Sequence, residues 1–217
     1  MTKADTISKR NRILNAAEEL FAQRGFDGVT LRQIASGANV DVALASYHFG
    51  KKLDLFNAVF DRRAELLNGS RLSALRLAQE NASKRGPTVE QIIEAFLRPL
   101  EIAQESGDEG WKSYLALIAY VNNSPHWGSS MMSKIFDELV TEFILALKKA
   151  LPHAKDEDIY WCYNNLSGAL TLTLAQTGRI DNLSKGICLS SDFKAAYDVM
   201  IPFAAAGFRT VCKAKKK

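Results

Sequence analysis

The sequence predicts an all-α protein built in two parts, and three observations support that prediction. Apolar residues recur at helical spacing in nearly every segment; in residues 8–24 the stripe comprises Ile13, Leu14, Ala17, Leu20 and Phe21. Two Thr-x-x-Gln sequences, at residues 30–33 and 88–91, have the spacing of a helix capping box. No segment shows the period-two alternation of a half-buried strand. We therefore expect about nine helices and no sheet.

The first 80 residues predict four helices, of which the second and third are short. The first ends at Gly25, where a backbone with positive φ is favoured. Thr30 caps the second helix, and Asn39 ends it because Asn tolerates the left-handed conformation. Asp41 is a suitable N-cap for a third helix that reaches residue 47 or 48. Gly50 precedes a long fourth helix that runs to about residue 79.

The rest of the chain predicts five more helices. Pro99 should kink the first of them and Pro202 should interrupt the last, because proline lacks an amide hydrogen and clashes with the preceding turn. Residues 181–190 read as a loop. The helices are expected from residue 88 past residue 100, and at 111–121, 129–151, 156–176 and 191–212.

Composition excludes several classes of protein. Hydrophobic residues make up 47% of the 217 residues and charged residues 24%, which is too apolar for intrinsic disorder. The longest apolar runs, such as residues 115–121, are far shorter than the ~20 residues that span a bilayer, and the polar amino terminus lacks a signal-peptide core. A cytoplasmic location is expected. Three widely spaced cysteines suggest neither a disulfide framework nor a zinc site, so no metal or cofactor is expected.

The formal charge of +4 is distributed unevenly along the chain. Residues 1–63 hold 10 Lys and Arg against 7 Asp and Glu, and residues 64–212 hold 14 against 17. Residues 213–217 add four lysines. This asymmetry indicates an amino-terminal part that meets a polyanion and a larger part that need not. We expect domains at 1–55 and 56–212, followed by a basic tail at 213–217.

The two short helices, joined by a tight turn and braced by longer helices, predict a helix-turn-helix. In such a unit the second helix enters the major groove of DNA while flanking residues contact phosphates. The segments Arg24-Gly25-Phe26, Thr30-Leu31-Arg32-Gln33-Ile34-Ala35, Ala38-Asn39-Val40 and Tyr47 to Phe56 resemble the DNA-binding domain of TetR-family repressors. The resemblance covers about residues 8–63.

The carboxyl-terminal part resembles more weakly the fatty-acid-responsive PsrA-type branch of that family. The matching segments are Phe96-Leu97-Arg98-Pro99, Ala150-Leu151-Pro152, Leu166-Ser167-Gly168-Ala169 and residues 201–207. The resemblance implies a regulator, without enzymatic activity, that binds an operator in double-stranded DNA. It also implies a homodimer that a small hydrophobic molecule, such as a fatty acid or acyl derivative, releases from the operator.

Matching the motif residue by residue implies a DNA-binding set. Thr30 would cap its helix and touch a phosphate, Arg32 would reach guanine or phosphate, and Lys52, with Lys51 beside it, would bind phosphate. A solvated surface arginine and a simple cap are the alternatives for Arg32 and Thr30. The outward face of the recognition helix comprises Val42, Ala43, Leu44, Ser46, Tyr47 and His48. Because this face has few amide or guanidinium groups, base readout would depend on thymine methyl groups and DNA shape.

Two positions depart from the family pattern. Asn39 stands where glycine is usual in the turn, and its tolerance of positive φ can absorb the change. Asp41 stands where Ser or Thr is common. A carboxylate facing DNA is repelled unless capping hydrogen bonds hold it inward, so we do not expect Asp41 to contact DNA.

Fourteen of the twenty aromatic residues lie after residue 63, in the larger part. Most belong to a core, but the resemblance implies an effector cavity among them, with Asn122 or His126 as a polar anchor. The remaining predicted lining residues are Phe96, Leu100, Trp111, Tyr114, Ile118, Val121, Trp127, Phe136 and Phe143.

A dimer surface is expected on the last two long helices. Leucines repeat there at four-residue intervals beside small residues, which would let a partner helix approach closely; burial inside the monomer is the alternative. The predicted interface residues are Leu166, Ala169, Leu170, Leu174, Phe203 and Phe208. A two-fold dimer would place recognition helices in successive major grooves, about 34–36 Å apart.

Two other functions compete with this interpretation. Cys162 with His126 or His153 could form a nucleophile and base, although Cys162 lies between Trp161 and Tyr163 on an apolar helix, where thiols are usually inert. A helical protein could also act at an anionic membrane surface through its lysine tail. Such a protein would not need two short capped helices.

Overall fold

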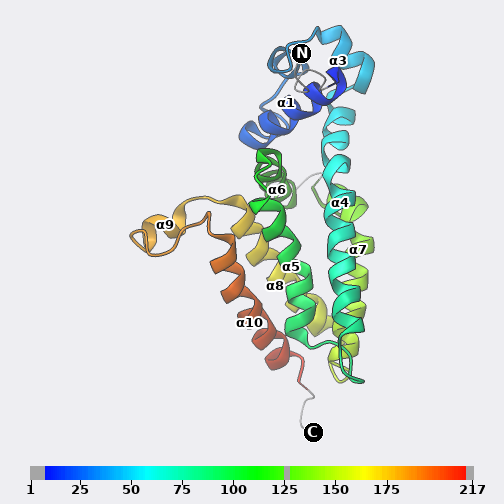
Figure 1. The fold of residues 1–217 in the computed structure, drawn as a ribbon, viewed down its shortest axis with the longest axis vertical. Coiled ribbons are helices and arrows are strands. Elements are labelled where there is room, and N and C mark those ends of the chain that lie inside the picture. Colours follow the sequence, from blue (N-terminus) through cyan, green and yellow to red (C-terminus); the bar gives the residue numbers. More distant parts are fainter. Residues whose placement is uncertain (1–7, 125–127, 214–217) are drawn as a thin grey trace.

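The computed structural model describes residues 8–124 and 128–213, and within them every regular element is a helix (Figure 1). These residues form ten helices rather than nine, because the segment expected to be a loop near residue 181 contains a short one. The helices are α1 (Lys9–Arg24), α2 (Leu31–Gly37), α3 (Val42–Phe49), α4 (Lys52–Glu80), α5 (Val89–Glu105), α6 (Glu109–Asn122), α7 (Gly128–Ala150), α8 (Asp156–Ala175), α9 (Arg179–Leu183) and α10 (Phe193–Val211).

The long helix α4 joins a small domain to a large one. Helices α1 to α3 gather around its beginning, at the top of Figure 1, and α5 and α7 pack along its remaining length. Helix α6 contacts both α1 and α8, and α10 packs against α5 and α8. The small domain therefore touches the large one through α4 and through α6.

Local sequence signals set most of the helix ends. The capping box at Thr30 is present: Gln33 N donates to Thr30 Oγ1 at 3.3 Å, and Thr30 N donates to Gln33 Oε1 at 2.8 Å. The box at Thr88 is present as well. Asn39 has a φ of 51°, so it ends α2 in the left-handed conformation as the sequence predicts.

Both internal prolines lie within continuous helices. Helix α5 runs through Pro99, and α10 runs through Pro202, so the predicted interruption of the last helix is wrong. Proline fixes a φ near the helical value and removes one hydrogen bond only. The buried face of α10, which includes Tyr197, Ile201 and Phe208, holds the helix together across that lost bond.

One hydrophobic core extends through both domains. The rings of Phe21 and Phe56 lie 4.8 Å apart in the small domain, and Phe56 is 5.4 Å from Phe60. Phe60 is in turn 5.6 Å from Tyr114 of α6. This chain of aromatic contacts leads from α1 along α4 into the large domain, so a shift of α6 against α4 reaches the small domain through packed side chains.

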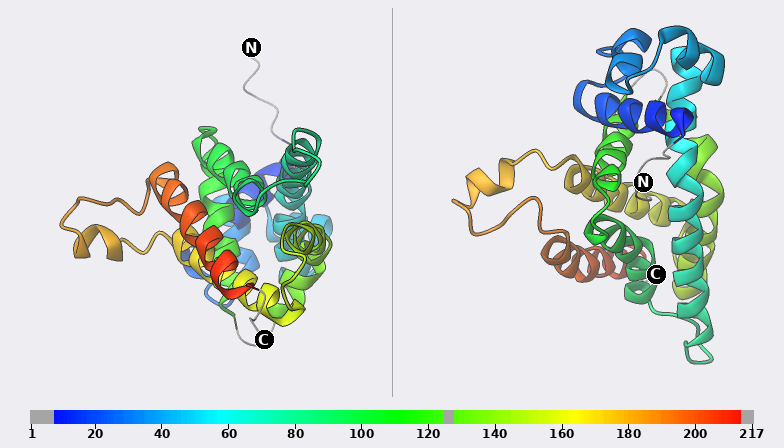
Figure 2. Two further views of the ribbon diagram at one scale, coloured as in Figure 1. Left: turned by 90° about the horizontal axis from the view of Figure 1, so that it is seen from below. Right: turned by 45° about the horizontal axis from the view of Figure 1, so that its top comes forward.

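An arm formed by residues 176–192 projects from the body and carries α9 (Figures 1 and 2). Its backbone folds on itself: Ser190 N donates to Asp181 Oδ2 at 3.0 Å, and Cys188 N donates to Ser184 Oγ at 2.9 Å. Hydrophobic side chains on it remain exposed, and Ile187 keeps 87% of its surface open. In the part of the chain that the structure describes, no helix is both long and apolar enough to cross a membrane.

Candidate nucleic-acid interface and ligand cavity

Helix α3 presents a free outer face at the end of the small domain. Ala45 and Phe49 are buried and fix the helix to the core. The predicted outward residues Val42, Ala43, Ser46, Tyr47 and His48 are all exposed, and Leu44 is half-buried. Tyr47 is 83% exposed, which leaves its ring and hydroxyl free to reach a partner. The face has the dimensions of a single two-turn helix, which a major groove can accept.

The start of α2 combines a closed cap with free amide groups. The Thr30 hydroxyl donates to Gln33 Oε1 at 2.9 Å and accepts from Gln33 N, so its hydrogen is already used. The backbone amides of Leu31 and Arg32, which precede Gln33 in the first helical turn, have no intrahelical acceptor. These amides, with the exposed Arg32 beside them, are the groups here that can bind a phosphate.

Lys52 has a structural contact that the sequence did not reveal. Its Nζ donates to Phe26 O at 2.9 Å and to Val29 O at 3.0 Å, and it lies 4.2 Å from the centre of the Phe26 ring. The half-buried ammonium therefore fastens the loop between α1 and α2 to the start of α4. One of its three N–H groups remains for a phosphate. Lys51, in contrast, is exposed.

Asp41 stays on the exposed surface. It is the N-cap residue of α3, but its carboxylate makes no capping hydrogen bond. The carboxylate is thus not held inward, and it adds a negative charge at the edge of the face that α3 presents.

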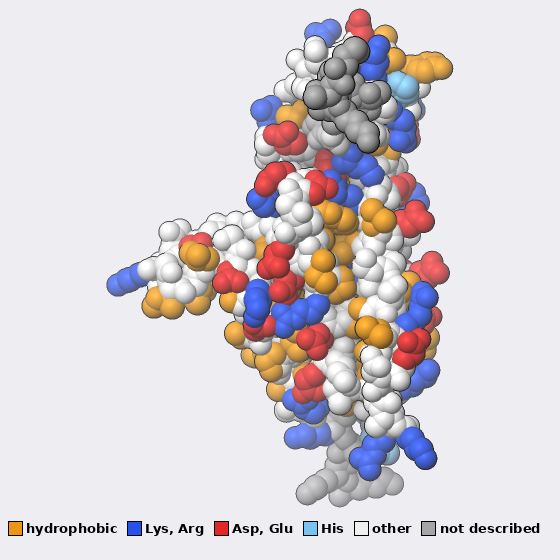
Figure 3. All heavy atoms as spheres, in the orientation of Figure 1, with side chains coloured by type: hydrophobic (Ala, Val, Ile, Leu, Met, Phe, Trp, Pro, Cys, Tyr) orange, Lys and Arg blue, Asp and Glu red, His pale blue; other side chains and the backbone are white. Residues whose placement is uncertain are grey.

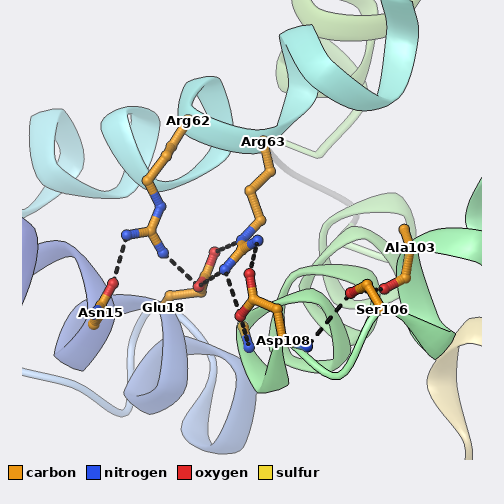
Figure 4. A network of polar contacts seen from close by, with 8 residues as sticks. Asn15, Glu18, Arg62, Arg63, Ala103, Ser106 and Asp108 are labelled. Carbon is orange, nitrogen blue, oxygen red and sulfur yellow. Dashed lines mark hydrogen bonds and ion pairs between the residues drawn. The ribbon is translucent and has the colours of Figure 1, made fainter. Parts of the chain in front are cut away.

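A buried ion-pair network ties the two domains together where α1, α4 and α6 meet (Figure 4). Glu18 of α1 is only 2% exposed and receives Arg62 Nη2 at 2.5 Å and Arg63 Nε at 2.8 Å. Arg63 Nη1 continues to Asp108 Oδ2 at 2.8 Å. Arg62 also reaches Asn15 Oδ1 at 2.6 Å. Glu18 and the two arginines thereby connect α1 to α4, and Asp108 extends the network to the start of α6.

The same network fixes the start of α6. Asp108 caps this helix by accepting from Gly110 N at 2.9 Å, and its hydrogen bond to Arg63 lowers the pKa of its carboxyl group. A Cβ on Gly110 would collide with the Arg63 guanidinium, so this position requires glycine. Arg63 also lies over the Trp111 ring, 4.8 Å from its centre.

A second contact between the domains involves Tyr120 of α6. Phe26 N donates to the Tyr120 hydroxyl at 3.3 Å. Gly25 has a φ of 67°, and a Cβ there would lie 2.7 Å from Tyr120 atoms. Glycine at this position therefore both ends α1 and lets the Tyr120 ring approach the backbone.

Between α4, α5, α6, α7 and α8 the large domain contains a two-part cavity. An inner space of about 40 Å³ adjoins an outer one of about 430 Å³, and both are lined by Asn122, Met132, Phe136, Val140, Tyr163 and Ser167. The predicted residues Phe96, Leu100, Ile118, Asn122 and Phe136 all line the inner space. Asn122 Nδ2 donates to Thr171 Oγ1 at 2.6 Å, so this amide is tied to α8.

Other predicted cavity residues lie elsewhere. Trp111 sits at the domain junction against Arg63, and Tyr114, Val121 and Phe143 are buried in the core outside the cavity walls. Helical spacing marks these positions as inward, but it does not distinguish a core position from a cavity wall. His126 and Trp127 lie outside the described residues.

The sequence-based prediction missed most of the residues that line the inner space, among them Arg71, Tyr163 and Ser167. For Arg71 a signal existed. Phe60, Ala64, Leu67 and Leu75 of α4 form a buried stripe, and Arg71 occupies the next position of that stripe between Leu67 and Leu75. An arginine on the apolar face of a helix is unusual enough to indicate a site.

The structure divides the predicted dimer residues: Leu170 and Leu174 line the inner cavity, whereas Leu166, Ala169, Phe203 and Phe208 line a groove between α8 and α10. Leu166, Leu170, Leu174 and Phe208 are buried within the chain itself, whereas Ala169 and Phe203 are exposed, Phe203 by 77%. Four-residue spacing places the leucines on one face of α8, but that face packs inward. The exposed apolar residues of the opposite faces form the α8–α10 face, which comprises Trp161, Ala169, Leu172, Val199, Phe203 and Val211.

The thiols are poorly suited to nucleophilic chemistry. Burial raises the pKa of Cys162, and burial together with Cys162 raises the pKa of Cys212 to about 12. His153 lies exposed in the turn after α7. The thiols of Cys162 and Cys212 therefore remain protonated at neutral pH.

Family models match both parts of the chain. A model described as "Bacterial regulatory proteins, tetR family" matches residues 13–59, and one described as "Tetracyclin repressor-like, C-terminal domain" matches residues 94–207. The fold thus defines a class of protein: a helical protein with an exposed helix-turn-helix and a separate domain that contains a cavity. The chain belongs to the TetR family of DNA-binding transcriptional regulators.

Curated relatives support the same class over shorter stretches. The chain is 32% identical over 140 residues to the transcriptional regulatory protein RaaS of Mycobacterium tuberculosis, covering 64% of this chain and 55% of RaaS. It is 41% identical over 61 residues to the repressor BepR of Brucella suis, covering 28% and 29%, and 31% identical over 86 residues to the activator FasR of Mycolicibacterium smegmatis, covering 40% and 39%. The matches thus span about half or less of these relatives.

Solved structures show the fold over nearly the whole chain. A TetR-family regulator from Shewanella sp. PV-4 aligns with a TM-score of 0.62 at 17% identity, covering 90% of this chain and 97% of that one. The multidrug binding protein EbrR, in complex with malachite green, aligns with a TM-score of 0.58 at 18% identity, covering 89% and 96%. At this identity the likeness concerns the fold alone.

Proposed function

We propose that this protein is a ligand-responsive transcriptional repressor that a small hydrophobic molecule releases from its operator. One observation carries the proposal: the single helix α4 begins at the nucleic-acid face and continues, without interruption, into the wall of the cavity. From Lys52 to Arg71 it rises about 28 Å, at about 1.5 Å per residue. Repression is supported by relatives such as BepR, which is named a repressor.

The proposed mechanism is a shift between two arrangements of α4. A ligand that holds α4 against α6 and α8 in one arrangement changes the position of the small domain, because Arg63 and Glu18 bind α4 to α1 and α6. Ligand and operator then weaken each other reciprocally, typically by about 1 to 3 kcal/mol in such systems. A fatty acid or acyl derivative remains the proposed type of effector.

We propose further that the functional unit is a homodimer formed through the α8–α10 face. Hydrophobic side chains gather along the flank that α10 forms and on the arm (Figure 3). A groove of about 430 Å³ between α8 and α10, and one of about 590 Å³ beneath the arm, have predominantly apolar walls, such as Phe203 and Leu172. A second copy would cover these grooves and bring two copies of α3 to one side of the assembly.

The function is tested by measuring binding of the full chain to the DNA upstream of its own gene. Fluorescence anisotropy should show sequence-selective binding that weakens steeply with salt, unlike binding to a scrambled fragment of equal length. Small molecules that copurify with the protein, identified by mass spectrometry, should release the bound DNA. Equal affinity for both fragments would contradict the proposal.

A further inference from the structure

An arginine lies buried in the cavity, and among the described residues it has no ion-pair partner. Arg71 is 4% exposed, its Nε donates to Phe96 O at 2.9 Å, and its guanidinium carbon lies 4.2 Å from the centre of the Phe96 ring. Pro99 lacks an amide hydrogen and cannot donate to the carbonyl of Ala95, the neighbour of the Phe96 carbonyl that Arg71 uses. Among the described residues, Nη1 and Nη2 make neither a hydrogen bond nor an ion pair.

This arrangement is costly in the free protein. A buried charge without a partner loses its hydration and gains little in return, and replacing it with an apolar residue is often neutral or stabilising. Burial lowers the pKa of Arg71 to about 10, which still leaves the guanidinium charged at neutral pH. The fixed Nε contact and the Phe96 ring hold this charge in one orientation.

Other polar groups around Arg71 also lack hydrogen-bond partners among the described residues. The hydroxyls of Tyr114 and Tyr197 are buried and unpaired among the described residues. Both tyrosines, together with Tyr163 of the cavity wall, interact electrostatically with Arg71. Ser167 and Thr171 add two hydroxyls to the inner space.

The shape and charge of the cavity orient a ligand. The inner space of about 40 Å³ has room for a group the size of a carboxylate, since one water molecule occupies about 30 Å³. The outer space of about 430 Å³ has room for the remainder of a small molecule. The carboxylate of Asp137 lines the outer space only, so an anion is repelled there and attracted inward by Arg71.

We propose that the inner space is a carboxylate subsite: the effector is an organic carboxylate whose head group pairs with Nη1 and Nη2 of Arg71. The body of the effector then lies against Met132, Phe136 and Val140 in the outer space. A carboxylate matches the two parallel N–H groups of a guanidinium, and its spare lone pairs can accept from serine and threonine hydroxyls. This inference rests on the proposed ligand response, and it names the chemical class of the effector.

The test uses isothermal titration calorimetry on the full chain without DNA. Two carboxylates, octanoate and 4-phenylbutanoate, are each compared with the matching alcohol and the matching ammonium compound. At least one carboxylate should bind tenfold or more tightly than its alcohol, and the ammonium compounds should not bind measurably. A carboxylate that binds no better than its alcohol in both series would overturn the proposal.

Variants on one helix separate binding from folding. Arg71→Met should abolish the preference for carboxylate and leave the melting temperature unchanged or higher, because a buried unpaired charge is removed. Arg76→Met, at an exposed position of the same helix, should keep the preference. If Arg71→Met has a lower melting temperature and an unaltered preference for carboxylate, Arg71 has a purely structural role. If that variant does not fold, Arg71→Lys is measured, with weakened but retained preference expected.

Two further outcomes decide between the subsite and the wider ligand response. If octyl phosphate binds more tightly than octanoate, the subsite prefers a phosphate group to a carboxylate, and the proposal as stated is overturned. Calorimetry requires no DNA, so the two proposals can fail separately. A protein that binds carboxylates but no operator would contradict only the proposed function. A protein that binds its operator but shows no preference for carboxylates would contradict only the subsite.

Discussion

Two adjacent lysines at the start of α4 illustrate how differently neighbouring side chains contribute. Lys52 donates to two loop carbonyls, Phe26 O and Val29 O, so its ammonium stabilises the small domain before any DNA arrives. Lys51 is exposed and contributes its charge alone. A basic residue at a position that matches the family motif can thus both stabilise the fold and bind DNA.

We expect Lys52→Ala to weaken DNA binding to all sequences alike, to flatten the salt dependence, and also to lower thermal stability. Leaving two buried carbonyls without a donor costs about 1 to 3 kcal/mol. Lys51→Ala should flatten the salt dependence by a similar amount without loss of stability. Anisotropy at several salt concentrations and thermal melting measure the two effects. An unchanged salt slope for Lys52→Ala would leave that residue only its structural role.

Asp41 should oppose DNA binding. Its carboxylate has no capping bond to hold it inward, so Asp41→Asn removes one negative charge from the edge of the face while keeping a good N-cap residue. Tighter binding, most visible at low salt, is expected. Glu138→Gln, an exposed change on α7, provides the control and should leave affinity unchanged. Weaker binding by Asp41→Asn would show that the carboxylate makes a favourable contact.

At the scale of elements, the junction of α1, α4 and α6 decides how the domains communicate. Glu18, Arg63 and Asp108 come from three helices and form one network, and Tyr120 adds a contact with the end of α1. Because Glu18 is buried, removing its charge would leave Arg62 without an ion-pair partner and Arg63 with Asp108 alone, which makes this the costliest position in the network to alter.

The Asp108 contact should give stability a defined pH dependence. Arg63 lowers the pKa of Asp108 below its ordinary value of 3.8, so the ion pair stabilises the folded state above that pH and is lost as pH falls through the lowered pKa. Asp108→Asn should therefore reduce stability at pH 7, by no more than about 1 kcal/mol for this half-exposed group, and have little effect near pH 2. Urea unfolding at both pH values measures the difference.

Asn at position 108 preserves the helix cap, which isolates the ion pair. Asp27→Asn, in the exposed loop after α1, serves as the comparison and should show no such difference between the two pH values. An equal loss of stability at both values for Asp108→Asn would indicate altered packing rather than a lost charge.

At the scale of the whole molecule, the net positive charge available to bind DNA depends on how many copies of the chain assemble. The first 63 residues carry 10 basic and 7 acidic residues, a modest excess that two copies double. In the proposed dimer, affinity for DNA would therefore come from positioned groups on two small domains rather than from bulk charge. The exposed apolar face of α8 and α10 provides the surface through which two copies can be held at a fixed spacing.

We expect Phe203→Glu and Leu172→Glu to convert a dimer into a species of 24.0 kDa and to weaken operator binding strongly. Each places a charge in the centre of the α8–α10 face. Leu66→Glu, equally exposed but on α4, should leave the dimer intact. Light scattering after size exclusion measures the mass. A wild-type chain that binds DNA as a 24.0 kDa species would contradict the dimer.

The sequence by itself determined the helix-turn-helix and most of the elements, but it predicted neither α9 nor the continuity of α10 through Pro202. Capping residues such as Thr30 and Thr88, left-handed positions such as Asn39, and helical periodicity act within a few residues of one another, so local patterns predict them. The exposed face of α3 follows in the same way, because Ala45 and Phe49 mark its buried side. Five predicted residues lining the inner cavity belong to helices whose inward faces follow from the same periodicity.

Only the tertiary structure decided how those inward faces are used. Whether the leucines of α8 face the core or a partner, whether Tyr114 lines a cavity or fills the interior, and which carbonyls receive Lys52 depend on helices distant in the sequence. Arg71 shows the limit most clearly. Its place on the apolar stripe of α4 is visible in the sequence, but the absence of a countercharge among the described residues is not. A missing partner is a property of the packed molecule, because any of the surrounding helices could have supplied one.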